Sequence, residues 1–326
     1  MSLPLVVFLD LLCIAVGLNV FAWFHHVRDA YFPRETAEVD PVVLITPSPA
    51  PTPVPESTPT PVPEDDEPER VYSGVWGEKF ADRFTDGEVI RTENSYRSAN
   101  VSVTLTHVER EGLSYHVADI YISDLKYLRS AFGEKGYGSR SMAADIASAN
   151  DAVIAISGDY YSARREGIVV RNGLLYRDTR FEDVCVLLGD GRMLTLSDRE
   201  TDLEALTQAA PWQVWSFGPR LLENGKAMTK FNSAVVRKNP RSAIGYVEPG
   251  HYYFVQVDGR GAYGSHGMTM TELAELFESL GCETAYNLDG GQTAGMCWDG
   301  ELISFPYGRS VSDIIFITDS PENGEG

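Results

Sequence analysis

The chain has 326 residues, of which 43% are hydrophobic and 23% are charged, and its formal net charge is −20. Nucleic acid and anionic lipid surfaces are polyanions, so this acidity argues against both as partners. An anionic substrate would need a local cluster of arginines to overcome the repulsion.

The first segment is an almost wholly apolar run from Leu3 to Phe24, interrupted by Asp10. A bilayer span takes about 20 such residues. No Lys or Arg precedes the run and no small-residue cleavage site follows it, which is unusual for a signal peptide. We therefore predict an uncleaved transmembrane anchor over residues 1–28, with the rest of the protein extracytoplasmic at the cell membrane.

Residues 29–70 are rich in Pro and Thr and end in an acidic patch. Such a segment cannot bury a core and is predicted to be a disordered, extended linker. An alternative is a Pro-rich ligand for a cytosolic partner. Residues 71–319 then form the folded part, and residues 320–326 a disordered tail. The cysteines of the folded part, Cys185, Cys282 and Cys297, show no zinc-binding spacing. We expect buried free thiols, although Cys282 and Cys297 could pair.

Strand and helix patterns are mixed along the folded part. Val101, Val103 and Leu105 alternate with polar residues, which predicts a half-buried strand paired with residues 113–123. Capping boxes at Thr201-x-x-Glu204 and Thr269-x-x-Glu272 predict two helix starts, and residues 141–150 a third helix. Further strands are expected at 152–156, 184–188, 192–196, 213–217, 241–247 and 251–257. The predicted fold class is α+β, with a mixed β-sheet core and helices packed on it, preceded by one transmembrane helix and the Pro-rich linker.

The helix after Thr269 joins the strand that ends before Asp258 to a short strand, Ala285 to Leu288. A β-α-β unit of this kind predicts parallel neighbouring strands. Asp258 and Asp289 would then lie at one edge of the sheet, where open α/β sheets bind ligands. Gly290 and Gly291 would let a ligand approach the backbone closely. The plain alternative is a turn, because Asp-Gly is a strong hairpin signal.

Six short motifs in order resemble the phosphodiester glycosidase family, which includes the enzyme that removes N-acetylglucosamine from mannose-6-phosphate tags. The clearest is Asn287-Leu288-Asp289-Gly290-Gly291, which resembles the family's NLDGG signature. The others are Ser157-Gly158-Asp159-Tyr160-Tyr161, Arg241-Ser242-Ala243-Ile244-Gly245, Asp258-Gly259-Arg260, Gly267-Met268-Thr269 and Gly308-Arg309-Ser310-Val311-Ser312-Asp313. The resemblance covers roughly Ala99 to Asp319. It departs from the family at Ser157, where relatives have Asn, and at Gln292, where they have a third Gly.

The resemblance implies hydrolysis of a sugar-1-phosphodiester by a pair of carboxylates, with Asp289 and Asp258 as the catalytic candidates. A phosphate leaving group needs little protonation, so the site must mainly bind negative charge. The substrate-binding candidates are Arg241, Arg260, Arg309, Asp159, Asn287, Gly290 and Gly291. We expect Arg241 to hold phosphate bidentately. Structural salt bridges are the alternative role for all three arginines.

Three functions compete on these grounds. The first is a membrane-tethered extracytoplasmic enzyme acting on cell-envelope or exopolysaccharide glycans. The second is a non-catalytic envelope protein that binds phosphorylated glycans, which the Ser157 and Gln292 departures favour. The third is a cytosol-facing interaction protein. We expect no nucleic-acid partner, no metal site and no cofactor, and the sequence leaves a divalent cation open.

Overall fold

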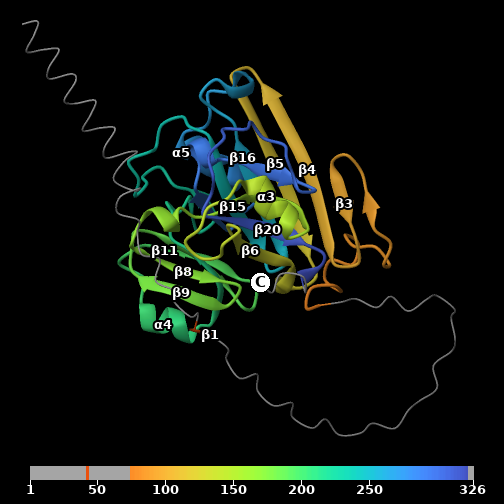
Figure 1. The fold of residues 1–326 in the computed structure, drawn as a ribbon, viewed down its shortest axis with the longest axis horizontal. Helices are drawn as coiled ribbons and strands as arrows, with labels where there is room; N and C mark the ends of the chain where they lie inside the picture. Colours follow the sequence, from red (N-terminus) through yellow and green to blue (C-terminus); the bar gives the residue numbers. More distant parts are fainter. Residues whose placement is uncertain (1–41, 44–73, 322–326) are drawn as a thin grey trace, which may run out of the picture. The chain divides into compact units, whose positions relative to one another are not determined.

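A computed structural model describes residues 42–43 and 74–321 of the chain (Figure 1). The predicted anchor over residues 1–28 and nearly all of the predicted linker lie outside these residues. Within the described part, no helix is both long and apolar enough to cross a membrane. Val42–Val43, inside the predicted linker, forms the two-residue strand β1, which pairs with β9.

The predicted α+β class is wrong, because the described residues fold mostly into β-sheets. One sheet has seven strands, in the order β17 (Thr284–Leu288), β15 (Arg241–Glu248), β16 (His251–Val257), β5 (Leu113–Ile122), β4 (Val101–Arg110), β3 (Ser95–Arg97) and β2 (Ile90–Arg91). A second has five, in the order β19 (Glu301–Leu302), β18 (Met296–Trp298), β7 (Ala152–Ser157), β20 (Asp313–Thr318) and β6 (Leu128–Phe132).

The remaining strands form a six-stranded sheet and a small hairpin. The six run in the order β1, β9 (Leu174–Thr179), β8 (Gly167–Arg171), β12 (Pro211–Trp215), β10 (Val184–Leu188) and β11 (Met193–Leu196). The hairpin is β13 (Leu222–Glu223) with β14 (Lys226–Ala227). Every pairing between these described strands is antiparallel, so the sheet core is not mixed.

Three short α-helices form where helices were predicted. They are α3 (Ala143–Ala149), α4 (Leu203–Gln208) and α5 (Met270–Ser279). The predicted capping box of α5 is confirmed, with Thr269 and Glu272 bonded reciprocally. Asp202 caps α4 in place of Thr201, since its Oδ1 accepts the N–H of Glu204. Within residues 74–321 there are also four 3₁₀ turns: η2 (Leu125–Tyr127), η3 (Tyr161–Ala163), η4 (Ala262–Gly264) and η5 (Gly291–Thr293).

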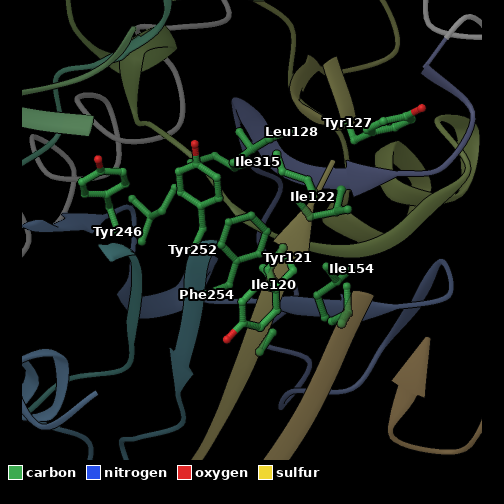
Figure 2. Close-up of a cluster of buried hydrophobic side chains, with 14 of the residues drawn as sticks. Ile120, Tyr121, Ile122, Tyr127, Leu128, Ile154, Tyr246, Tyr252, Phe254 and Ile315 are labelled. Carbon is green, nitrogen blue, oxygen red and sulfur yellow. The ribbon is translucent and has the colours of Figure 1, made fainter. Parts of the chain in front are cut away.

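The largest core lies between the seven-stranded and five-stranded sheets. Figure 2 shows Ile120 and Ile122 of β5 and Phe254 of β16 in one cluster with Ile154 of β7 and Ile315 of β20. All five side chains are fully or almost fully buried, and each contributes about 1.5–3 kcal/mol relative to an exposed position. The core therefore comes from sheet-on-sheet packing.

The helices cover outer faces of the sheets instead of forming the main core. Leu273 and Phe277 of α5 pack on the far side of the seven-stranded sheet, and Ile146 of α3 packs on the far side of the five-stranded sheet. β20 explains why: Ile315 faces the sheet interface, while its neighbour Ile314 packs under α3. A strand that is apolar on both faces needs a layer on each side. The three described cysteines are buried and free, as predicted.

Candidate active site

Three strands of the seven-stranded sheet bring the predicted acidic residues to one edge. β15 lies between β16 and β17 and is antiparallel to both, with Arg241 opposite Val257 and Ser242 opposite Leu288. The prediction that β16 and β17 are direct neighbours is therefore wrong. The two strands still end at the same edge of the sheet, because β16 and β17 are both antiparallel to β15 and therefore run in the same direction. Asp258 and Asp289 both leave their strands where β15 begins.

Asp289 lies where the seven-stranded sheet meets the five-stranded sheet. Its backbone N–H donates to the Gly158 carbonyl, just past the end of β7, at 2.9 Å. The hydroxyl of Thr293, which donates to the Gly290 carbonyl at 2.6 Å, lies beside its carboxyl group. Asp289 is only 8% exposed, and its Oδ2 has no hydrogen-bond partner among the described residues. This carboxyl group is thus withdrawn from water and only partly compensated.

Burial raises the pKa of Asp289 to about 7. The neighbouring Thr293 hydroxyl and the positive charges of Arg309 and Arg164 oppose that rise, whereas the charge of Asp159 adds to it. A carboxyl group with such a pKa can take up and release a proton near neutral pH, which an ordinary aspartate cannot do. Asp289 is therefore the described carboxyl group best suited to acid–base chemistry at this edge.

A buried charge network supports this position from below. The carboxyl group of Asp313 accepts from Arg171 Nε at 2.7 Å and from the backbone N–H of Asp159 at 2.6 Å. Arg171 Nη2 lies 3.5 Å from Asp159 Oδ2, and all three residues are at most 1% exposed. Burial raises the pKa of Asp313 to about 6, although Arg171 opposes this. The network fixes the end of β7 and hence Gly158, to which Asp289 binds.

Two arginines bring positive charge to Asp289. Arg309 Nη2 donates to the hydroxyl of Tyr160 at 2.9 Å, and the guanidinium stands 5.5 Å from the centre of that ring. Arg164 lies 4.0 Å from Asp159 Oδ1 and stacks at 4.5 Å on Phe181. Both charges lower the pKa of Asp289. Arg309 is exposed, so a bound anion could reach it without a large rearrangement.

Asp258 has different surroundings. It is fully buried, and its Oδ1 accepts from Gln256 Nε2 at 2.9 Å and from the Phe305 N–H at 3.1 Å. Its Oδ2 has no partner within the described part of the chain. The carboxylate with the larger effect on the pKa of Asp289 is Asp159, whose charge raises it.

The two glycines after Asp289 pack tightly against the start of β15. The Gly291 N–H donates to the Pro240 carbonyl at 2.9 Å, and a Cβ on Gly290 would stand only 2.7 Å from the same oxygen. A Cβ on Gly291 would meet Arg260 Nη2 at 3.2 Å. Arg260 is therefore beside this loop, and it also donates to Asn239 Oδ1 at 3.3 Å; its role in substrate binding stays a prediction.

Asn287 and Arg241 have structural contacts. Asn287 Nδ2 donates to the Gly218 carbonyl at 2.8 Å, which ties β17 to the segment after β12. Arg241 is 3% exposed, and its guanidinium donates to backbone carbonyls of Met268, Val235 and Arg237 at 3.1, 3.0 and 2.6 Å. Burial lowers the pKa of Arg241 to about 10. These contacts favour the structural alternative for Arg241 over bidentate phosphate binding.

A cavity of about 1470 Å³ lies elsewhere, between β6, α3 and the six-stranded sheet. Arg171 lines it, together with aromatic residues such as Trp212 and Tyr176. None of the nine predicted site residues is in its wall. Size alone therefore does not identify the reacting centre, and the buried, proton-exchanging carboxyl group of Asp289 is the stronger indicator.

Sequence reasoning missed Arg164, Arg171, Thr293 and Asp313 as members of this site. Asp313 ends the Gly308–Asp313 motif, and Arg164 begins an Arg-Arg pair in an acidic chain, so a local signal was present for these two. The two departures from the family pattern have separate outcomes. Ser157 donates its hydroxyl to the Thr293 carbonyl and so holds the loop after Asp289. Gln292 is exposed.

Comparisons with known proteins identify a family and a shared fold. The sequence profile of the family described as phosphodiester glycosidase matches residues 150–318. That range contains Asp159, Arg171, Asp289 and Asp313. A curated relative, the SPbeta prophage-derived uncharacterized protein YomE of Bacillus subtilis (strain 168), is 30% identical over 197 residues. The match covers 56% of this chain and 30% of that protein, so the chain spans less than a third of the relative's length.

One solved structure with a similar fold is the catalytic domain of zebrafish N-acetylglucosamine-1-phosphodiester α-N-acetylglucosaminidase. The TM-score is 0.53 at 19% identity, covering 67% of this chain and 83% of that chain. At this identity the likeness shows a shared fold.

Proposed function

This chain belongs to the phosphodiester glycosidase family, and on that premise we propose that it hydrolyses the bond between the anomeric carbon of a sugar and a phosphodiester. The observation that carries the proposal is the surroundings of Asp289. A buried carboxyl group with a pKa of about 7 lies within reach of two positive charges, those of Arg309 and Arg164. A proton-exchanging group beside fixed cations suits a reaction that expels an anion.

In the proposed reaction, the ionised carboxylate of Asp289 takes a proton from water as the water oxygen attacks the anomeric carbon. The bond between that carbon and the phosphodiester oxygen breaks, and a phosphate monoester leaves with the electron pair. Arg309 and Arg164 balance its growing negative charge, since guanidinium groups hold phosphate oxygens well. The leaving group is a weak base, so no strong general acid is needed.

The sugar we propose is an α-linked N-acetylglucosamine, which is the sugar in the name of the zebrafish enzyme with the similar fold. The setting we propose is an extracytoplasmic, envelope or exopolysaccharide glycan. The support for that setting is the Pro- and Thr-rich segment of residues 41–69, a composition suited to a spacer.

The test is hydrolysis of the benzyl phosphodiester of N-acetylglucosamine-α-1-phosphate, measured as the release of free sugar and benzyl phosphate. Asp289→Asn should lower kcat/KM by about 100-fold or more, the usual scale for a lost acid or base. The wild-type kcat/KM should fall below about pH 7 as Asp289 becomes protonated. Asp258→Asn, at the other strand end, distinguishes two mechanisms. A comparable loss of kcat/KM supports the predicted carboxylate pair, and a small loss supports a mechanism centred on Asp289.

Arg309→Ala serves as the control for charge recognition. It should damage turnover of the phosphodiester strongly and leave any slow turnover of neutral 4-nitrophenyl α-N-acetylglucosaminide nearly unchanged. Binding of the phosphodiester without release of sugar by the wild type would instead establish the non-catalytic alternative. Full activity in Asp289→Asn would overturn the assignment of Asp289.

A further inference from the structure

One segment of this acidic chain carries only positive charge. No Asp or Glu occurs between Glu223 and Glu248. The same stretch contains five cationic residues: Lys226, Lys230, Arg237, Lys238 and Arg241. Its central part, residues 228–239, is the connection that leads from β14 into β15, and we call it the basic loop. In a chain with a formal charge of −20, such a stretch is a local site of attraction for anions.

The cations of this segment differ in how they are neutralised. Lys226 pairs with Glu278 at 3.1 Å and Lys238 with Glu272 at 3.8 Å. Lys230 and Arg237 are exposed, and neither has an ion-pair partner in the described residues. Two positive charges therefore remain available at the surface of the basic loop.

The basic loop ends against the glycines of the candidate site. Pro240, its next residue, accepts the Gly291 N–H, and Arg260 bridges the loop to the glycines by contacting Asn239 beside Gly291. Exposed Arg260 therefore adds a cation where the basic loop meets the glycines that follow Asp289.

The backbone of the loop is held in place despite its exposure. Arg241 donates to the carbonyls of Val235 and Arg237, and the Val236 carbonyl accepts the N–H of Met270 at the start of α5. Asn232 is hydrogen-bonded to the buried carboxyl group of Asp183. A loop fixed at these points presents its cations without a large ordering cost on binding.

We propose that the basic loop binds a further phosphodiester of the substrate, so that the preferred substrate is a polymer with repeating phosphates. This inference rests on the proposed function, because it takes the Asp289 site as the cleavage point. Lys230 and Arg237 contact the neighbouring phosphate, while the acidic remainder of the surface repels the polymer elsewhere. A monomeric phosphodiester has no second phosphate to place against these cations.

The experiment compares a polymer of α-linked N-acetylglucosamine-1-phosphate units with the benzyl phosphodiester monomer. Lys230→Glu/Arg237→Glu should raise KM for the polymer about tenfold at low salt, a change within the range of electrostatic steering, and change monomer kinetics less than about twofold. High salt should shrink the polymer effect. An equal loss on both substrates, with or without a lower Tm, would overturn the proposal.

The matched control is Lys79→Glu/Arg192→Glu, which changes the net charge by the same amount at the opposite end of β15 and β16. Lys79 pairs there with Glu248, and Arg192 follows Gly191, whose Cβ would lie 3.2 Å from Pro249. The control should leave polymer KM near the wild-type value, and a similar rise in both double variants would overturn a local role.

If neither substrate is cleaved, the proposed function fails on its own, and calorimetric binding of the polymer still tests the loop. Affinity that falls in the loop variant alone supports the inference. Unchanged affinity overturns it. Binding to phosphatidylglycerol vesicles that depends on Lys230 and Arg237, without any dependence for the polymer, would assign the loop to a membrane surface instead.

Discussion

Asp289 and Asp258 end strands that run in the same direction, yet their surroundings differ sharply. The carboxyl group of Asp258 accepts a backbone N–H and a glutamine amide, which suits a fixed structural acceptor. Asp289 has less compensation for its burial, and its pKa is raised to about 7. Residue type and strand position were equal for the two. The hydrogen bonds that each carboxyl group accepts distinguish them, together with the arginines near Asp289.

The raised pKa of Asp289 makes a prediction about stability. Because the pKa of Asp289 is higher in the folded than in the unfolded state, its protonation stabilises the fold fully below about pH 4, and this stabilisation is lost as the pH rises through 7. An asparagine does not titrate, so Asp289→Asn lacks this pH-dependent loss. From pH 4 to pH 8, the unfolding free energy of the variant should therefore rise by on the order of 4 kcal/mol relative to that of the wild type.

Urea denaturation of both proteins at the two pH values measures this difference, and any pH-independent cost of the substitution cancels in it. A wild-type and variant pair with parallel pH profiles would show that Asp289 titrates near its ordinary pKa. Such a result would also remove the basis for its proton transfer at neutral pH.

Arg171 is the second residue whose environment dictates an outcome. It is the cation between Asp313 and Asp159, and all three are buried. Arg171→Met would leave two carboxyl groups buried without their cation, which should cost about 3–5 kcal/mol of unfolding free energy. The loss should grow with pH, because the unpaired carboxyl groups must ionise in the core.

The double variant Arg171→Met/Asp313→Asn should recover part of that loss, since one unpaired charge is then removed. Arg192→Met is the surface comparison: Arg192 pairs with Asp190 at 2.7 Å, but both side chains are more than half exposed, and the change should stay within about 0.5 kcal/mol. Equal costs for Arg171→Met and Arg192→Met would contradict the network's supporting role.

At the scale of elements, the site depends on contact between the Asp289–Thr293 loop and the start of β15. A Cβ on Gly290 would lie 2.7 Å from the Pro240 carbonyl oxygen, closer than real side chains come, so Gly290→Ala must displace the loop. We expect kcat/KM to fall at least about tenfold, because small displacements of a reacting group are costly. A modest fall in Tm should accompany it.

Gly295→Ala provides the matched comparison within the same stretch. There the nearest atoms to an added Cβ are 3.4 Å away, an ordinary contact, so activity and Tm should remain close to wild type. Equal activity in the two variants would mean that the position of the loop does not control the reaction.

At the scale of the whole molecule, the sheets and the charges are organised separately. The seven-stranded and five-stranded sheets pack face to face, and α5 and α3 close their outer faces. Asp289, at the end of a strand of the seven-stranded sheet, lies at the junction of these two sheets. Its N–H donates to Gly158, just past β7 of the five-stranded sheet. The charge of −20 is spread over the chain, whereas the basic loop concentrates the opposite sign beside the junction.

Local sequence was sufficient for most elements. Alternating residues predicted β4 and its turn into β5, which pair with Arg110 opposite Leu113. The Thr269 capping box predicted the start of α5. The ordered motifs indicated the family that the profile match confirms. These signals are local because capping, alternation and turn formation involve residues close in sequence.

Only the tertiary structure decided the sheet order, the fold class and the membership of the site. β15 enters between β16 and β17, and the helices cover sheets that pack on each other. Arg171 reaches Asp313 across 142 residues, and Asp289 acquires its raised pKa from burial and from distant charges. Pairing partners, desolvation and Coulomb interactions depend on distance in space, which no local pattern of residue types contains.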